Sequence, residues 1–159
     1  MNDEEISQYI TTTFAGVDVV VANGDSFFFY NPDTTVPPDH MFPWLTLVTS
    51  NFNDPFSDLD RPGVFRLNIG LSKQTFRARF GTPKLPSGPD GAAASGASAH
   101  DYDFSALDQM LPHPVYGRQY WVCVLNPSAE TFATDVQPLL AEAYEQAVSK
   151  YQRGRSHTG

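Results

Sequence analysis

The sequence predicts a single α+β domain over residues 1–152, with a mainly antiparallel sheet of about five strands packed by N- and C-terminal helices. Three observations support this fold class. The chain has 159 residues, which suits one domain. Apolar residues recur at helical spacing near both ends, and short β-rich runs separated by turn residues lie between them. Hydrophobic residues make up 41% of the chain, which is enough for one packed core.

The N-terminal segment predicts a helix that ends at Gly16. Asn2 or Asp3 can cap this helix, and acidic residues in its first turn suit the helix dipole. Its apolar stripe consists of Ile6, Tyr9, Ile10 and Phe14.

Val17–Ala22 and Ser26–Tyr30 predict a β-hairpin, because the Asn-Gly-Asp between them favours a tight turn. The proline-rich stretch 31–43 predicts an extended loop, and Trp44–Thr49 predicts a third strand. The polar stretch 51–62 predicts a surface loop.

A strand over Gly63–Gly70 is predicted next, with alternate residues on opposite faces. Ser72 then caps a helix that Gly81 closes. Residues 82–100 are rich in Pro, Gly, Ala and Ser and predict a flexible insertion. In the predicted strand over Gly63–Gly70, the apolar face carries Phe65, Leu67 and Ile69, and the other face carries Arg66 and Asn68.

The apolar residues of 104–111 fit a short helix opened by Asp103 or Ser105. Gln119–Asn126 is apolar on both faces and predicts a central strand. The last helical region starts at Ser128 or Asp135, with its main segment beginning near Val136 because Pro138 fits only a first turn. The basic tail 153–159 is expected to fray.

Charge is sorted along the chain. Residues 1–60 hold ten acidic residues and no Lys or Arg, whereas residues 61–84 hold six basic residues and no acid. The net charge is -8, which argues against nucleic acid or an anionic membrane as a partner. The basic segment therefore either pairs inside the fold or holds an anion. Its members are Arg61, Arg66, Lys73, Arg77, Arg79 and Lys84.

Composition and the N-terminus predict a soluble, cytoplasmic protein. Cys123 is the single cysteine, so no internal disulfide can form, which fits a reducing compartment. The acidic N-terminus has no signal-peptide pattern, and no apolar run approaches the length of a membrane span. The common nucleotide, metalloprotease and hydrolase motifs are absent, so we expect no cofactor.

The sequence Pro112-His113-Pro114 is the most distinctive candidate for chemistry. Two prolines fix the backbone around a histidine that can serve as acid or base near Tyr116, although a rigid structural connector fits equally. Arg66 and Arg61 can clamp a carboxylate or phosphate, or pair with acids such as Asp58.

Other candidates have stronger structural explanations. His100, Asp103 and His113 contain metal-ligand types, but His100 ends the insertion and Asp103 suits a cap, so no metal is expected. Cys123 lies in an apolar strand and is expected to be inert. Trp121 can line a ligand site or fill the core.

The stretches 61–76, 103–116 and 121–128 resemble a family of small domains of unknown function from high-GC bacteria, over nearly all of residues 3–152 apart from the insertion. The order of elements, with a Pro-x-Tyr, a Trp strand and a final helix containing Tyr144, also resembles the MmcQ/YjbR family, whose fold is similar to that of CyaY. That resemblance implies a sheet layered with helices and a DNA-binding role, which the acidic charge opposes. Neither family supplies a catalytic residue.

Together these features predict a bacterial binding or accessory module for a small acidic ligand or a protein partner. The expected ligand-binding residues are Arg61, Arg66, His113, Tyr116 and Trp121. One alternative is a cofactor-free enzyme in which His113 is the acid or base, Tyr116 donates a hydrogen bond and Arg66 stabilises an anion. A second is nucleic-acid binding through Lys73, Arg77, Arg79 and the basic tail.

Overall fold

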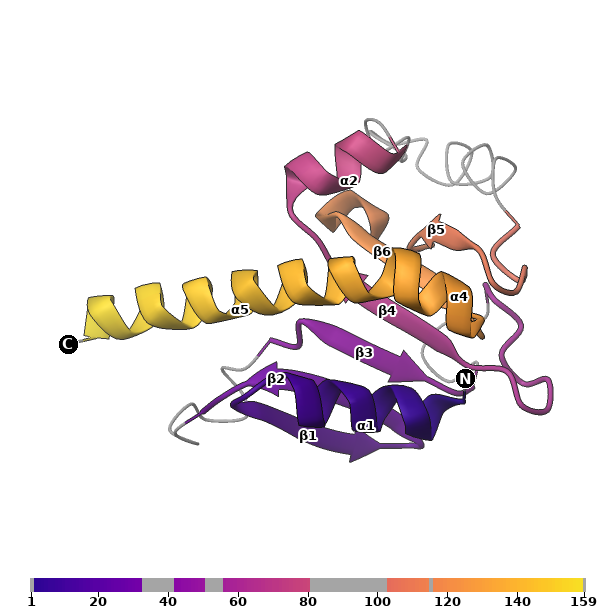
Figure 1. Cartoon of the computed structure of the whole chain (residues 1–159), viewed down its shortest axis with the longest axis horizontal. Helices are drawn as coiled ribbons and strands as arrows, with labels where there is room; N and C mark the ends of the chain where they lie inside the picture. The colour runs from indigo at the N-terminus through magenta and orange to yellow at the C-terminus, as the bar shows by residue number, and fades with distance from the viewer. Residues whose placement is uncertain (1, 33–41, 51–55, 81–102, 115, 159) are drawn as a thin grey trace, which may run out of the picture.

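The computed structural model describes residues 2–32, 42–50, 56–80, 103–114 and 116–158. Its centre is a six-stranded sheet in the order β1-β2-β3-β4-β6-β5, in which neighbouring strands run antiparallel (Figure 1). The strands are β1 (Val17–Ala22), β2 (Asp25–Tyr30), β3 (Leu45–Val48), β4 (Arg66–Gly70), β5 (Met110–Pro112) and β6 (Trp121–Leu125). The predicted α+β class and antiparallel sheet are confirmed.

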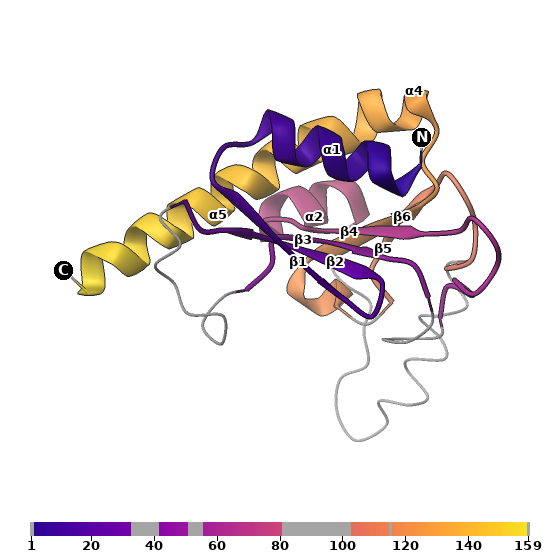
Figure 2. The same cartoon turned by 90° about the horizontal axis from the view of Figure 1, so that it is seen from below.

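The helices gather on one face of the sheet, as the view from below shows (Figure 2). They are α1 (Asp3–Thr13), α2 (Lys73–Phe80), α4 (Ala129–Thr131) and α5 (Gln137–Thr158), with a π-helical turn, η3 (Phe132–Val136), between the last two. A short 3₁₀ turn, η2 (Gly117–Gln119), precedes β6. The sheet therefore has a helix-covered face, which carries the α-helices, and an opposite face that carries no α-helix of the described chain.

The first helix and the hairpin form where the sequence predicts them, although the helix ends at Thr13 and not at Gly16. Asn2 Oδ1 accepts a hydrogen bond from the Glu5 N–H, and the Glu5 carboxylate accepts one from the Asn2 N–H, which completes a capping box. Asn23 and Gly24 both have positive φ, the requirement of the two-residue turn that matches the twist of a hairpin.

The main core lies between the helices and the sheet. Alternation puts Leu67 and Ile69 of β4 and Val122 and Val124 of β6 on the helix-covered face, where all are buried. Trp44 also fills this core. The sequence predicts a central strand over Gln119–Asn126 because its residues are apolar on both faces. The observed strand β6 lies between β4 and β5, which confirms this prediction.

Aromatic rings join α5 to α1 and β2. The Tyr144 hydroxyl donates a hydrogen bond of 2.6 Å to the Ala15 carbonyl, and burial, with Tyr30 nearby, raises the pKa of Tyr144. Tyr30 packs edge-on against Tyr144 and Tyr151. This cluster holds the long last helix against the hairpin.

The predicted short helix over 104–111 is wrong. Leu107 instead bridges Leu125, and Met110–Pro112 forms β5 against β6. Asp103 accepts hydrogen bonds from the Ser105 hydroxyl and N–H, which lower its pKa and close a turn without starting a helix. The helical spacing is overridden because an eight-residue segment gains little from helix formation and more from pairing with a central strand.

The last helical region begins at Ser128, whose hydroxyl accepts from the Thr131 N–H. Of the two predicted starts, Ser128 is therefore confirmed. The π-helical turn ends at Val136, two residues before Pro138, the residue that cannot donate to the helix ladder. The helix continues through most of the basic tail to Thr158, where fraying was expected.

Two predicted segments lie wholly or mostly beyond the part of the chain that the structure describes. The insertion 82–100 and most of the loop 31–43 lie outside the described residues. Among the helices of the described chain, none combines the length and apolarity needed to span a bilayer.

Replacing Tyr144 with Phe tests the link between α5 and α1. Loss of the hydrogen bond to Ala15 is expected to lower the free energy of unfolding by about 1 kcal/mol in urea titrations. Tyr9→Phe is the matched control and should change it by less than about 0.5 kcal/mol. Equal effects would show that the Tyr144 hydroxyl adds nothing.

Asp108 makes stability depend on pH. The Ser128 N–H, which donates to Asp108 Oδ1 at 2.7 Å, is the main cause of its lowered pKa, and the Thr131 hydroxyl adds to it. A lowered folded-state pKa stabilises the protein above the unfolded value of about 3.9, and this stabilisation is lost as pH falls through the folded value.

We therefore expect Asp108→Asn to lose stability less steeply than the parent below about pH 4. Urea unfolding of both proteins across this pH range measures the difference. If the free energy of unfolding falls equally steeply with pH in the parent and in Asp108→Asn, the Asp108 carboxylate has no such role.

Candidate functional site

The face of the sheet opposite the helices carries a line of buried polar side chains. Alternation places Arg66 and Asn68 of β4 on this face, and the strand register sets Thr46 of β3 directly opposite Asn68. Cys123 of β6 lies opposite Asn68 on the other side. All four are buried, so this face is covered although no helix of the described chain packs on it.

Arg66 is at the centre of this line, and 1% of its surface is exposed. Its Nε donates to Asn68 Oδ1 at 2.9 Å, and its Nη1 donates to the Ser57 hydroxyl at 2.9 Å. Asn68 in turn donates to Thr46 Oγ1 at 2.9 Å. A buried guanidinium is stable only when its N–H groups are hydrogen-bonded, so the neighbouring polar residues are a requirement of this position.

His113 lies next to the guanidinium and is 3% exposed. Its Nε2 is 3.5 Å from Arg66 Nη2, and its Nδ1 accepts a hydrogen bond of 3.0 Å from the Tyr116 N–H. Its own backbone is fixed, because the His113 N–H donates to the Trp121 carbonyl and its carbonyl accepts from the Gly117 N–H.

These contacts define the protonation of the imidazole. Nδ1 accepts a hydrogen bond, so in the neutral ring the proton is on Nε2. A second proton on Nδ1 would break the hydrogen bond from Tyr116 and add a cation beside Arg66. The neutral Nε2–H tautomer is therefore the one that this geometry favours, and it turns an N–H group toward the guanidinium.

Tyr116 and Trp121 border the histidine. The Tyr116 ring centre is 5.0 Å from that of His113, and Tyr116 is 50% exposed, so its ring reaches from the buried site to solvent. Trp121 lies against Gly70, where a Cβ would come within 3.0 Å of the indole ring. Gly70 is thus the residue that allows Trp121 to cross the end of β4.

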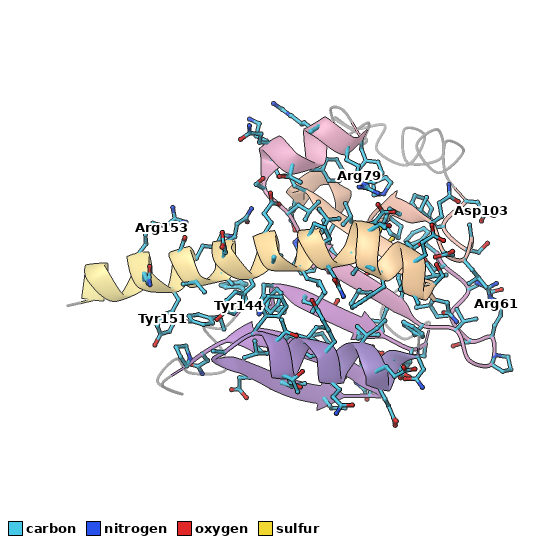
Figure 3. All side chains as sticks on the ribbon, in the orientation of Figure 1. Arg61, Arg79, Asp103, Tyr144, Tyr151 and Arg153 are labelled. Carbon is cyan, nitrogen blue, oxygen red and sulfur yellow. The ribbon has the colours of Figure 1, made fainter. Side chains whose placement is uncertain are left out.

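Arg61 has a structural role that matches the pairing alternative. Its guanidinium donates to the carbonyls of Ser57, Asp58 and Ser105, and it forms an ion pair with Asp58 at 3.7 Å. Figure 3 shows Arg61 and Asp103 at the same end of the molecule. Arg61 therefore joins the loop before β4 to the turn before β5, and Ser57 connects it to Arg66.

The basic residues do not form one surface. Arg66 is buried, Arg61 holds loop backbone, and Arg79 of α2 lies 3.8 Å from Asp135 on the helix-covered side. Figure 3 shows Arg79 and Arg61 well separated. A run of basic residues in the sequence is divided here among a strand, a loop and a helix.

The loop 51–62, which the sequence predicts to be a surface loop, contains two buried residues. Leu59 packs with Val48 and Leu125 in a small second core on the polar face, and Ser57 contacts Arg66. Sequence reasoning missed Ser57, and it noted the position of Asn68 but not its contact with Arg66. The available signal was Leu59, a large apolar residue between two aspartates.

The described residues contain no group of three or more His, Cys, Asp or Glu side chains placed to hold a metal ion. His100, one of the metal candidates, lies outside the described residues. Cys123 is fully buried, and its sulfur is 3.8 Å from the Pro112 carbonyl.

The five predicted binding residues thus form a connected set. Ser57 links Arg61 to Arg66, Arg66 lies beside His113, and His113 is held by Tyr116 and Trp121 through backbone or ring contacts. Arg66 and His113 meet at its centre, where Nη2 and Nε2 are 3.5 Å apart. The arrangement is suited to hold an anionic oxygen acceptor.

Comparison with known proteins gives one match. Residues 1–156 match a family of unknown function, DUF6194, which confirms the predicted resemblance to a family without assigned function. No curated protein and no solved structure matches. The resemblance to the MmcQ/YjbR family and to CyaY is therefore not supported.

The two arginines should differ sharply in their effect on stability. Arg66→Ala removes hydrogen bonds inside the protein and is expected to cost about 3 kcal/mol or more, whereas the half-exposed Arg61→Ala should cost about 1 kcal/mol. Urea unfolding measures both. A larger loss for Arg61→Ala would contradict the central position of Arg66.

Proposed function

We propose that this chain, which belongs to the DUF6194 family of unknown function, is a binding module for a small acidic organic ligand. The ligand's carboxylate would lie between Arg66 and His113. The observation that carries this proposal is the approach of Arg66 Nη2 to His113 Nε2 at 3.5 Å while Nδ1 accepts from Tyr116.

A carboxylate oxygen beside this pair could accept from both the guanidinium and the Nε2–H group, in addition to the partners that the two side chains already have within the fold. A carboxylate oxygen suits this position because it accepts several hydrogen bonds and neutralises the guanidinium charge. Low exposure strengthens such a contact, because the hydrogen bonds act in a medium of low dielectric constant.

Tyr116 supports a route to the site. Its half-exposed ring contacts the His113 ring, so we propose that the ligand enters beside this side chain, whose rotation would keep the backbone hydrogen bond to Nδ1. The phenol hydroxyl can then donate to a second oxygen of the ligand. In this proposal, Trp121 and Arg61 lie at the border of the site and do not contact the carboxylate of the ligand.

The main alternative is that an acidic side chain of the chain itself supplies the acceptor, which would make the cluster purely structural. The enzyme alternative agrees less well with the geometry: a neutral Nε2–H histidine can donate a hydrogen bond, but its basic nitrogen, Nδ1, already accepts one from the Tyr116 N–H. The nucleic-acid alternative has less support, because the net charge of -8 opposes it and Arg79, one of its residues on α2, forms an ion pair with Asp135 at 3.8 Å.

A ligand screen tests the proposal. Acetate, succinate and inorganic phosphate are added to the pure protein, and the melting temperature and the ¹H–¹⁵N resonances of the His113 ring are recorded. We expect a carboxylate to raise the melting temperature of the parent and to shift the Nε2 resonance.

Three variants make the result specific. His113→Phe keeps a ring but lacks the Nε2–H donor, and Arg66→Lys keeps the charge but lacks the fork, so both should lose the response. Arg79→Gln, on the helix-covered side, should keep it. A folded parent that responds to none of these anions would contradict the proposal and leave an internal acceptor as the explanation.

A further inference from the structure

The two edges of the sheet are built differently. The β5 edge is three residues long and contains Pro112, both of which discourage pairing with another strand. The β1 edge is six residues long and reads VDVVVA, without proline or lysine, and its register with β2 has no bulge. Figure 1 shows β1 along the rim of the sheet, with α1 over its face.

The outer side of β1 also exposes apolar side chains. Val20 is 43% exposed and Val21 is 66% exposed. Among the described residues, β1 pairs with β2 alone. A long, mostly apolar edge of this kind, with Asp18 as its one charged residue, is a template for another strand.

The hairpin determines which backbone groups face outward. Ala22 and Asp25 flank the two-residue turn and form a hydrogen-bonded pair, so Val20 and Asp18 also direct their backbone groups toward β2. The alternate residues therefore direct N–H and C=O away from the sheet. These residues are Val17, Val19 and Val21.

We propose that β1 pairs antiparallel with β1 of a second copy of this chain, around a two-fold axis at Val19. This register sets Val19 opposite its own copy and Val17 opposite Val21, which gives about six backbone hydrogen bonds. It is the register that uses every outward-facing residue. The dimer has a continuous sheet with the helices of both copies on the same face.

Charge is compatible with this occupant. Asp18 is the only charged residue of β1, and the register places it opposite Val20 rather than opposite its own copy. Each chain carries a net charge of -8, so the two copies repel at long range. Added salt should therefore strengthen the dimer, which is the reverse of an association held by ion pairs.

Sedimentation velocity of the full chain from micromolar to millimolar concentration tests the proposal. We expect a dimer that becomes tighter as salt is raised. Val21→Pro removes an outward N–H at an exposed position and should weaken the dimer about tenfold or more. Val21→Thr is the matched control, because it keeps both the branched shape and the N–H, and it should dimerise as the parent does.

A cysteine at the axis tests the register. In a Cys123→Ser background, Val19→Cys should form a disulfide-linked dimer under mild oxidation, because paired Cα atoms about 5.5 Å apart suit a disulfide. Val21→Cys should not, because its partner is Val17. A parent that stays monomeric throughout, or a dimer that Val21→Pro leaves unchanged, would overturn the proposal.

Discussion

The buried guanidinium of Arg66 is the constraint on which the second face of this sheet depends. A charged group buried on a central strand must be surrounded by hydrogen-bond partners. Asn68 supplies one from the same strand, and Ser57 supplies another from the preceding loop. His113 comes to the same point from the segment after β5. The loops on this face are therefore held by a polar centre, whereas the helices on the other face pack on an apolar core.

This division explains which parts of the fold the sequence could predict. Strand alternation correctly separated Leu67 and Ile69 from Arg66, and local turn and cap signals located the hairpin and the first helix. The burial of Arg66 could not be predicted, because His113 is 47 residues away in the chain. Sequence order grouped Arg66 with Arg61 and Arg79, although the fold sends each to a different environment.

The same distinction explains the error at 104–111. Helical spacing of four apolar residues is a local signal, but the segment lies beside β6 and gains more by completing the sheet edge. Pro112 then has two roles: it ends the edge strand, and it fixes the approach to His113. The candidate site was partly predictable for this reason, since a histidine between two prolines indicates a rigid position. Its neighbours depend on the sheet order, which the sequence did not reveal.

The chemistry of the site follows from the direction of one hydrogen bond. Because the Tyr116 N–H donates to Nδ1, His113 turns a donor rather than a lone pair toward Arg66. Two donors select an acceptor, and the positive charge selects an anionic one. The chain's net charge of -8 repels anions at long range, so the proposed capture of a carboxylate would depend on the close contacts at Arg66 and not on steering. Such a site would favour a small ligand that enters past Tyr116 over a polyanion that must approach the whole surface.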